Sequence, residues 1–348
     1  MKTTAAILVE LGRPLELVEL EIPPLKPGQV LVEVAYSGVC HTQVLEARGH
    51  RGEDKFLPHC LGHEGSGVVR EVGEGVTRVA PGDQVILSWI KGPGLDVPGT
   101  VYDWNGRAVN AGGITTFSHH AVMAENRLTK LPAGVAMKDA ALVGCAVATG
   151  AGAVFNAAHP LPGSSLAVFG IGGVGLCAVA AAALSGCCPI IAIDLKPQKL
   201  ALARQMGATD TIEAGETEVL AAIGGLCKGG VDHAIEATGR PAVMVQALGS
   251  VRAQGGAAVI VGNAHFGETL EVDPRQLNQG KKLLGTWGGD SVPDRDFPRY
   301  CELIAAGRLN LQPMLSPPYP LNAINQALDD LEAALVVRPI IDLTGETG

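Results

Sequence analysis

Two groups of residues in this 348-residue chain could do chemistry, and the first is a run of glycines. The run Gly170-Ile171-Gly172-Gly173-Val174-Gly175 lies between an apolar segment (166–169) and an Ala-rich segment (176–185). A second apolar segment (190–193) follows and ends at Asp194. These segments predict a strand, a glycine turn, a helix and a second strand. In such a βαβ unit the turn lets backbone N–H groups approach a pyrophosphate.

Asp194 lies near the position, roughly 20 residues beyond the glycines, where a carboxylate accepts hydrogen bonds from a ribose 2′-hydroxyl. Its charge would repel a 2′-phosphate, which favours NAD over NADP. The alternative is a glycine turn that only packs a helix against a strand. The flanking strand and helix and the acid at the second strand's end all favour a dinucleotide site.

The second group contains Cys40, His63, Glu64 and Cys145, whose side chains are of the types that bind zinc. Catalytic zinc takes three protein ligands from thiolate, imidazole and carboxylate, and keeps a fourth position open. These long spacings are not diagnostic, and buried thiols with a surface histidine would give the same pattern. The other thiols are interpreted as small buried or structural residues: Cys60, Cys177, Cys187, Cys188, Cys227 and Cys301. His59 is interpreted as structural as well.

The elements around these residues predict an α/β protein with two domains, as the chain length also suggests. Short strands and glycine turns over residues 1 to about 35, 61–85 and 118–123 predict a bent β-barrel, and residues 37–42 are expected to open a short helix. Residues 88–113 are expected to form a loop, and 136–155 to be helical. After Asp194 the pattern predicts helices at 196–206 and 243–248 and strands at 231–236 and 257–261, which continue a doubly wound parallel sheet. Helices near 297–306 and 321–335 and a strand at 339–343 follow. The predicted division is 1–150, completed by 290–348, and 151–289.

The composition excludes several classes of binding partner. The net charge is −9 and no basic run is present, which argues against nucleic acid and anionic membranes. The apolar run at 176–184 is too short to span a bilayer, and residues 1–10 do not resemble a signal peptide. Eight cysteines in a chain of this length do not indicate a disulfide scaffold. A soluble, cytoplasmic protein is expected.

Several motifs occur in order along nearly the whole chain. They are Val39-Cys40-His41-Thr42, Gly62-His63-Glu64 through Gly73, Pro81-Gly82-Asp83, Gly144-Cys145, Ala148-Thr149-Gly150, the glycine run, Glu236-Ala237-Thr238-Gly239-Arg240, and Arg338. Together they resemble the zinc-dependent medium-chain alcohol dehydrogenases. The resemblance implies a GroES-like β-barrel catalytic domain, a Rossmann cofactor domain, and catalytic zinc on Cys40, His63 and Cys145. Glu64 would sit behind the metal as an occasional ligand.

The resemblance also implies roles for other residues. Thr42 would take the substrate proton, although a helix N-cap is its alternative role. His41 and Arg338 would contact cofactor phosphates, and Lys199 the adenosine ribose. Thr149 and Val174 would lie behind the nicotinamide, and Trp89 would form a wall of the substrate pocket. The implied enzyme transfers a hydride between NAD(H) and a small alcohol, aldehyde or ketone, and is a homodimer or homotetramer.

Three departures from the family pattern stand out. Residues 88–113 contain no cysteine, so the second, structural zinc of many relatives is not expected. Gln43 stands where an acid usually orients the ligand histidine, so the zinc would be more electrophilic. Leu45 replaces a relay histidine. Two alternatives stay open: a metal-free enone or quinone reductase on the same fold, and a non-catalytic nucleotide-binding protein.

Overall fold

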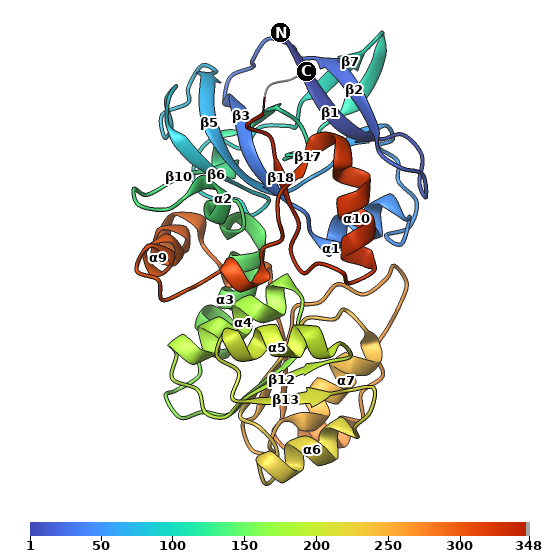
Figure 1. Cartoon of the computed structure of the whole chain (residues 1–348), viewed down its shortest axis with the longest axis vertical. Coiled ribbons are helices and arrows are strands. Elements are labelled where there is room, and N and C mark those ends of the chain that lie inside the picture. The colour runs from blue at the N-terminus through green and yellow to red at the C-terminus, as the bar shows by residue number, and fades with distance from the viewer. Residues whose placement is uncertain (346–348) are drawn as a thin grey trace. The chain divides into compact units, whose positions relative to one another are not determined.

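The computed structural model describes residues 1–345 and contains two units, each built around β-sheet (Figure 1). The first unit contains Met1–Cys145, Val292–Ala305 and the segment from Leu315 onward. The second contains Ala146–Ser291 and Ala306–Met314. The borders expected at 150/151 and 289/290 stay a prediction, because this division does not show which segments act as domains.

The first unit has two β-sheets. Strands β1, β2, β7, β8 and β4 form a closed barrel, and a second sheet runs β10, β6, β5, β3, β18, β17, with β9 also paired to β3. The strand bounds are β1 (Lys2–Leu8), β2 (Glu16–Glu21), β3 (Gln29–Gly38), β4 (His59–Cys60), β5 (Glu64–Val72), β6 (Gln84–Ser88), β7 (Val101–Trp104), β8 (Arg107–Asn110), β9 (His120–Ala124), β10 (Leu128–Lys130), β17 (Tyr319–Pro320) and β18 (Ile340–Asp342). The predicted GroES-like barrel fold is confirmed.

Strand β3 separates two aliphatic cores because both of its faces are buried. Val30, Val32 and Val34 join one core, and Leu31 joins the other. Helices α1 (His41–Ala47) and α10 (Ile324–Glu332) cover the first of these cores with Val44, Ile324 and neighbouring residues. The other helical segments of this unit are the 3₁₀ turns η1 (Glu125–Arg127) and η6 (Leu321–Ala323), and helices α2 (Met137–Ala140) and α9 (Pro293–Ala305). This packing anchors α1, which begins directly after Cys40.

The expectation of a loop over residues 88–113 is wrong in part, because strands β7 and β8 form an antiparallel hairpin there. Asn105 and Gly106 connect them with φ of 51° and 86°. Two positive φ angles are typical of the tight turn that Asn-Gly favours in hairpins. Tyr102 and Val109 alternate inward and are 2% and 0% exposed. The Asn-Gly signal was present in the sequence, but the surrounding Gly and Pro residues obscured it.

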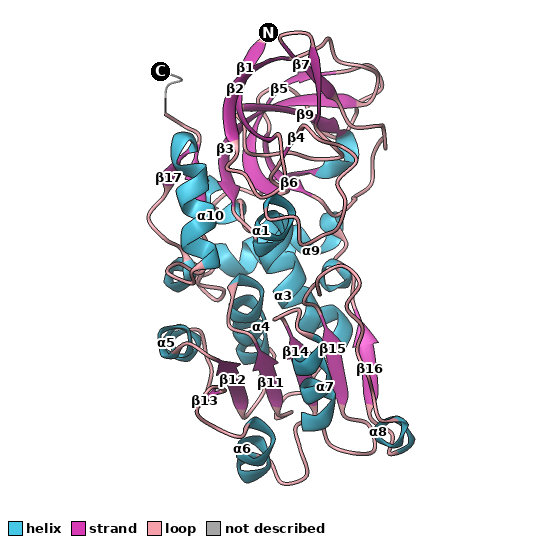
Figure 2. Cartoon of the chain, turned by 90° about the vertical axis from the view of Figure 1, so that its right-hand side faces the viewer, coloured by secondary structure: helices cyan, strands magenta, loops and turns pink. Residues whose placement is uncertain are grey.

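The second unit is a six-stranded parallel sheet in the order β13, β12, β11, β14, β15, β16 (Figure 2). Its strands are β11 (Leu166–Phe169), β12 (Ile190–Asp194), β13 (Asp210–Glu213), β14 (His233–Glu236), β15 (Ala257–Ile260) and β16 (Lys282–Gly285). Its helical segments are α3 (Ala148–Gly152), η3 (Ala153–Ala158), α4 (Gly173–Leu184), α5 (Pro197–Gln205), α6 (Val219–Leu226), α7 (Pro241–Ser250), α8 (Pro274–Asn278), η4 (Gly288–Asp290) and η5 (Gln312–Met314). The winding direction reverses between β11 and β14, which is where such sheets bind ligands.

The predicted doubly wound sheet is confirmed, and four elements of this unit were not foreseen. They are β13, α6, α8 and β16. In β13 only Ile212 is buried, so that strand has no apolar run to reveal it. In β16 Leu284 is exposed, because this strand is at the sheet edge. Edge strands bury too little surface to show a clear hydrophobic pattern.

The helical stretch Met137–Ala158 is the longest apolar helix in the part of the chain that the structure describes. It includes the π-helix η2 (Val143–Val147) and is long enough to cross a membrane. However, 83% of its most apolar 18-residue stretch is buried inside the protein. It is therefore a core helix of the protein and not a membrane span.

Candidate metal centre and dinucleotide site

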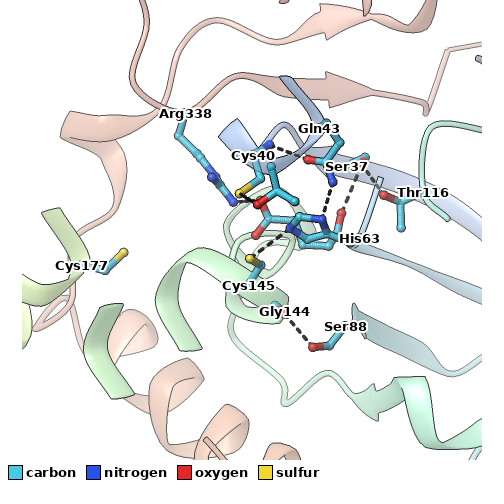
Figure 3. Close-up of polar contacts among 12 residues, drawn as sticks. Ser37, Cys40, Gln43, His63, Ser88, Thr116, Gly144, Cys145, Cys177 and Arg338 are labelled. Carbon is cyan, nitrogen blue, oxygen red and sulfur yellow. Dashed lines mark hydrogen bonds and ion pairs between the residues drawn. The ribbon is translucent and has the colours of Figure 1, made fainter. Parts of the chain in front are cut away.

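The three predicted zinc ligands converge within the first unit (Figure 3). Cys40 Sγ, a ring nitrogen of His63 and Cys145 Sγ all lie within 4.8 Å of one another. Cys40 precedes α1, His63 precedes β5, and Cys145 lies in η2. Cys40 and Cys145 are 8% and 5% exposed, so the two sulfur atoms are shielded from water. Tertiary folding thus assembles a small donor cluster from three distant segments.

Gln43 connects two of these residues. Cys40 is the N-cap of α1, with extended backbone, and its N–H donates to Gln43 Oε1 at 2.9 Å. The other end of the amide, Nε2, contacts His63 Nδ1. One side chain in the first turn of α1 therefore fixes both the Cys40 backbone and the His63 ring. This is the kind of outer contact that orients metal ligands.

The Gln43 amide suits the His63 ring less well than a carboxylate would. An amide nitrogen can only donate, so its contact with Nδ1 requires Nδ1 without a proton. The other ring nitrogen, His63 Nε2, lies 3.2 Å from Cys145 Sγ and is the ring atom placed to bind a metal. Metal binding at Nε2 moves the ring proton to Nδ1, which then needs an oxygen as acceptor. Gln43 Oε1 is already used by Cys40 N–H, whereas a carboxylate could accept from both.

The cluster contains one thiol whose pKa is lowered and two groups whose pKa is raised. A hydrogen bond between the two sulfur atoms holds the pKa of Cys40 well below its usual range and raises the pKa of Cys145. Burial lowers the pKa of His63, but the hydrogen bond and charge of Cys40 outweigh burial and raise it overall. Cys40 is therefore a ready thiolate, the form that metals bind. Two thiols and an imidazole at this spacing fit the donor set of a catalytic zinc site.

Behind the cluster lies a buried ion pair between Glu64 and Arg338. The two side chains are 0% and 3% exposed. Burial lowers the pKa of Arg338, but the charge of Glu64 outweighs it and raises the pKa overall. A Cβ at Gly38 would lie 2.2 Å from Glu64 Oε1, so only glycine leaves room for this carboxylate.

The ion pair changes how the roles of both residues are understood. Arg338 was expected at a cofactor phosphate, yet the structure gives its guanidinium a buried carboxylate partner. Glu64 is not part of the group whose ligand atoms lie within 4.8 Å. The phosphate contact of Arg338 and the occasional ligation by Glu64 both stay predictions.

The remaining predicted residues of the first unit lie near the cluster. Thr42 Oγ1 is 3.7 Å from Cys40 Sγ and is half-buried. Trp89 N–H donates to the His63 carbonyl at 3.1 Å, so the backbone of Trp89 is held beside a ligand residue. His41 is the exposed first residue of α1. Proton transfer by Thr42, a pocket wall at Trp89 and a phosphate contact at His41 stay predictions.

The glycine run forms the predicted tight turn in the second unit. Gly170 has φ of 90°, and a Cβ at Gly175 would lie 1.9 Å from the Gly170 carbonyl oxygen. A Cβ at Gly172 would have no described atom within 4 Å, so the turn is open on that side. Helix α4 begins at Gly173, and Val174 is half-buried in its first turn. The turn therefore packs closely against its own helix at Gly175 and is open at Gly172, where a pyrophosphate could approach the backbone.

Asp194 and its neighbours border this turn. Asp194 Oδ2 accepts from Ile171 N–H at 2.7 Å, and Oδ1 accepts from Lys196 N–H at 3.0 Å. Lys199 lies in the first turn of α5 and is half-buried. Thr149 Oγ1 is buried with no hydrogen-bond partner in residues 1–345. Their contacts with a ribose or a nicotinamide stay predictions.

A cavity of about 580 Å³ in the first unit is bordered by His63 and Gln43. An ion pair between Glu46 and Arg51 at 3.0 Å lines it, as does a contact between Asp54 and His59 Nε2 at 2.7 Å. Burial raises the pKa of Glu46, although the charge of Arg51 opposes the shift. The cavity contains neither Cys40 nor Cys145 in its lining, so it meets the cluster only through His63.

Sequence reasoning missed the contacts that hold the ligand segments in place. Ser88 Oγ donates to the carbonyl of Gly144, the residue before Cys145, at 2.6 Å. Ser37 Oγ lies 3.2 Å from the Glu64 carbonyl oxygen and donates to it. The Glu64–Arg338 pair joins residues separated by 274 positions. No local spacing signals such pairs.

Comparison with known proteins agrees with this geometry. A family described as "Alcohol dehydrogenase GroES-like domain" matches residues 26–133, and one described as "Zinc-binding dehydrogenase" matches residues 173–306. An S-(hydroxymethyl)glutathione dehydrogenase of Synechocystis sp. is 37% identical over 98% of this chain and 100% of its own length. The structure of benzyl alcohol dehydrogenase from Acinetobacter calcoaceticus has a TM-score of 0.90 and 32% identity, over 98% and 99% of the two chains. That of an alcohol dehydrogenase zinc-binding domain protein from Burkholderia ambifaria has a TM-score of 0.89 and 34% identity, over 99% and 100%.

Proposed function

Because this chain belongs to the zinc-dependent medium-chain alcohol dehydrogenase family, we propose that Cys40, His63 and Cys145 hold its catalytic zinc. The protein is an NAD-linked oxidoreductase that interconverts an alcohol and its carbonyl product. The observation that carries the site assignment is the convergence of the three ligand atoms within 4.8 Å. A metal-free reductase on this fold would have no need of such a set.

The residues around the cluster each have a defined task in this proposal. When bound, zinc supplies Lewis acidity that lowers the pKa of an alcohol hydroxyl, and NAD supplies the hydride acceptor. Cys40, His63 and Cys145 would be the three protein ligands, and a catalytic zinc with three protein ligands keeps a fourth position open for substrate. Thr42 Oγ1, 3.7 Å from Cys40 Sγ, accepts the proton of the substrate hydroxyl. Leu45 cannot carry that proton onward, so it leaves by another route.

The dinucleotide is assigned to the second unit. The Gly170–Gly175 turn would hold the pyrophosphate, and Asp194 would accept hydrogen bonds from the adenosine ribose. Lys199 adds a positive charge near that ribose. Thr149 and Val174 lie behind the nicotinamide, and the unpartnered Thr149 hydroxyl supports a ligand contact there.

The substrate is assigned a polar or charged tail that occupies the cavity beside His63. The Glu46–Arg51 and Asp54–His59 contacts support this choice, because they make the cavity lining polar, and an uncharged aromatic alcohol would make few polar contacts with it. Of the two named activities among the relatives, a glutathione adduct fits this lining better than benzyl alcohol. Comparing kcat/KM for S-(hydroxymethyl)glutathione, benzyl alcohol and a plain aliphatic alcohol tests the assignment. A preference for either uncharged alcohol contradicts it.

The oligomer is assigned as a homodimer in which β16 pairs with β16 of a second copy. Strand β16 is the sheet edge, and large apolar side chains nearby are exposed: Phe266 (80%), Trp287 (76%), Leu277 (47%) and Leu284 (37%). An open edge beside apolar surface favours pairing with another chain. The variant Leu284→Lys should convert the dimer to a monomer in light scattering, and an unchanged mass contradicts this interface.

A cytoplasmic location is assigned from thiol chemistry. All eight cysteines are free, which suits a reducing compartment. Recovery of the protein with the secreted or membrane fraction of fractionated cells would contradict it.

The experiment that tests the function measures zinc in the purified protein and NADH formation with a panel of alcohols. We expect bound zinc and turnover with NAD. Turnover of enones without zinc would support the metal-free reductase instead. Zinc without turnover of any alcohol or carbonyl would support a non-catalytic nucleotide-binding protein.

A further inference from the structure

A buried carboxylate at the carboxyl end of β14 has no role in the sites assigned above. Glu236 is 0% exposed. Its Oε1 accepts from Thr238 N–H at 2.7 Å and Gly239 N–H at 3.0 Å, and the Thr238 hydroxyl also donates to it. Its Oε2 accepts no hydrogen bond from residues 1–345 and faces Gly262, where a Cβ would lie 2.9 Å away. One carboxylate oxygen therefore holds the backbone of the loop that follows its own strand.

That loop, residues 237–240, is held between two others. A Cβ at Gly170 would lie 2.6 Å from Thr238 Cγ2, so the first glycine of the dinucleotide turn packs directly on the loop. On the other side, a Cβ at Gly262 would lie 2.1 Å from Gly239 N. Val261 N–H and Gly262 N–H both donate to the Glu236 carbonyl oxygen, at 2.9 and 3.0 Å. The loops after β11, β14 and β15 thus interlock with no room for extra atoms.

The sheet order shows which part of a dinucleotide these loops would face. Asp194 ends β12, on one side of β11, so the adenosine half lies on that side. The pyrophosphate lies at the start of α4, after β11. The rest of the dinucleotide must then extend across the switch point toward β14 and β15. The loops that Glu236 holds are therefore the floor under the nicotinamide half.

On the basis of the proposed NAD site, we infer that Glu236 is a positioning residue for the nicotinamide half of the cofactor. Its carboxylate fixes residues 237–240 against Gly170, and its carbonyl fixes residues 261–262. Burial raises the pKa of Glu236, while the hydrogen bonds that Thr238 and Gly239 donate to its carboxylate lower it, which is consistent with a carboxylate retained for a specific task. A residue that only stabilised the sheet would affect both halves of the cofactor equally.

The variant Glu236→Gln keeps the shape of the side chain but replaces one oxygen with a donor beside other N–H groups. We expect the Kd of NADH to rise about tenfold, as loss of one hydrogen bond to a charged group implies. The Kd of AMP, which contains only the adenosine half, should not change. Both constants come from fluorescence titration and need no turnover, so this test is independent of zinc and substrate.

Glu125 provides a matched control in the first unit. It is 1% exposed and accepts three backbone N–H bonds, from Thr77, Arg78 and Leu95 at 2.7 to 2.8 Å. Glu125→Gln should leave both Kd values unchanged. Equal weakening of NADH and AMP in Glu236→Gln, or no change in either, would overturn the inference.

A second variant covers the case in which Glu236→Gln does not fold. Thr238→Val is isosteric and removes the hydroxyl that donates to Glu236 and accepts from Arg240 N–H at 3.1 Å. We expect a rise of about threefold in the Kd of NADH, since the backbone hydrogen bonds to the Glu236 carboxylate remain. Unchanged NADH binding in this variant would overturn the inference, whereas failure of the proposed NAD function would show as no NADH binding by the unaltered protein.

Discussion

The metal cluster and the dinucleotide turn are both small sites, but the chain builds them in opposite ways. The turn, its helix and Asp194 belong to one continuous segment, and Asp194 Oδ2 binds Ile171 N–H only 23 residues away. The cluster joins Cys40, His63 and Cys145, and the last two are 82 residues apart. A local site depends on backbone conformation, whereas a non-local site depends on everything that holds its segments in register.

The neighbours of the two sites differ accordingly. At the turn, Gly170 and Gly175 are required because a Cβ there would collide with Thr238 Cγ2 and with the Gly170 carbonyl oxygen, whereas Gly172 faces open space. Charged and polar side chains surround the cluster, including Gln43, Glu64 and Arg338. Buried polar networks of this kind lose much of their function when one member is removed. We therefore expect single side-chain changes to affect the metal site more strongly than the dinucleotide site.

The largest expected effect is a loss of zinc and turnover that leaves the dinucleotide site intact. Cys145→Ala removes one zinc ligand, so bound zinc should be lost and turnover should fall by about 10³-fold or more, because Lewis-acid assistance is lost. NADH binding should remain, since the glycine turn is unchanged. Atomic emission measures the zinc, and NADH absorbance the turnover.

Cys301→Ala is the matched control for that experiment. Cys301 is a fully buried thiol of the same unit, and burial raises its pKa to about 12. It should keep its zinc and its activity. Zinc retained at full occupancy in Cys145→Ala would refute the ligand assignment.

The second prediction concerns the residue that connects two ligand segments. Gln43→Ala should weaken zinc binding by about 10- to 100-fold, as loss of an outer contact to a ligand histidine does elsewhere. Gln43→Glu should strengthen it, because a carboxylate can accept from both Cys40 N–H and His63 Nδ1–H. The added negative charge should also lower kcat. Competition with a colorimetric chelator measures the affinity, and weaker binding by Gln43→Glu would argue against this geometry.

The third prediction tests the local site. Asp194→Asn removes the charge but keeps an oxygen acceptor, so the preference for NAD over NADP should fall by about tenfold. Asp194→Ala also removes the acceptor for Ile171 N–H and should weaken both cofactors. The ratio of kcat/KM for NAD and NADP measures the effect. Unchanged discrimination in both variants would exclude a ribose contact.

The smallest effect concerns stability of the second unit. Asp232 accepts from Ser165 N–H and Oγ at 2.9 and 2.8 Å and from Arg252 Nε at 2.6 Å, which joins the starts of β11 and β14. Burial would raise the pKa of Asp232, but the bonds from Arg252 and Ser165 outweigh it and lower the pKa to about 2. Because the pKa is lowered, the ionised carboxylate stabilises the folded state at a pH above 3.8, the usual pKa of this group. This stabilisation is lost as the pH falls toward 2.

Asp232→Asn should therefore reduce the unfolding free energy at neutral pH by about 1 kcal/mol, after allowance for partial exposure of the pair. The difference from the unaltered protein should shrink below pH 3.8. Hydrogen exchange of the β11 and β14 amides measures it. Asp273→Asn, which breaks the exposed pair with Arg275, should have no measurable effect, and an equal loss there would contradict the prediction.

Much of the second unit could be predicted from the residues alone. Strand β11 has the predicted bounds, and α4 and β12 lie where the glycine run and Asp194 placed them. Apolar runs and glycine spacing encode such elements locally. Strand β13 could not be predicted, because Ile212 is its only buried residue. In the first unit, the β7–β8 hairpin depended on one Asn-Gly signal within a Gly- and Pro-rich stretch.

The amino-acid sequence by itself determined the βαβ unit and the residue types available for metal binding, because local periodicity and turn chemistry act within a few residues. Only the tertiary structure decided that Gln43 connects Cys40 with His63 and that Arg338 pairs with Glu64. It also decided that Glu236 joins three loops. Those contacts depend on strand register and helix packing, which bring together side chains that no local pattern relates.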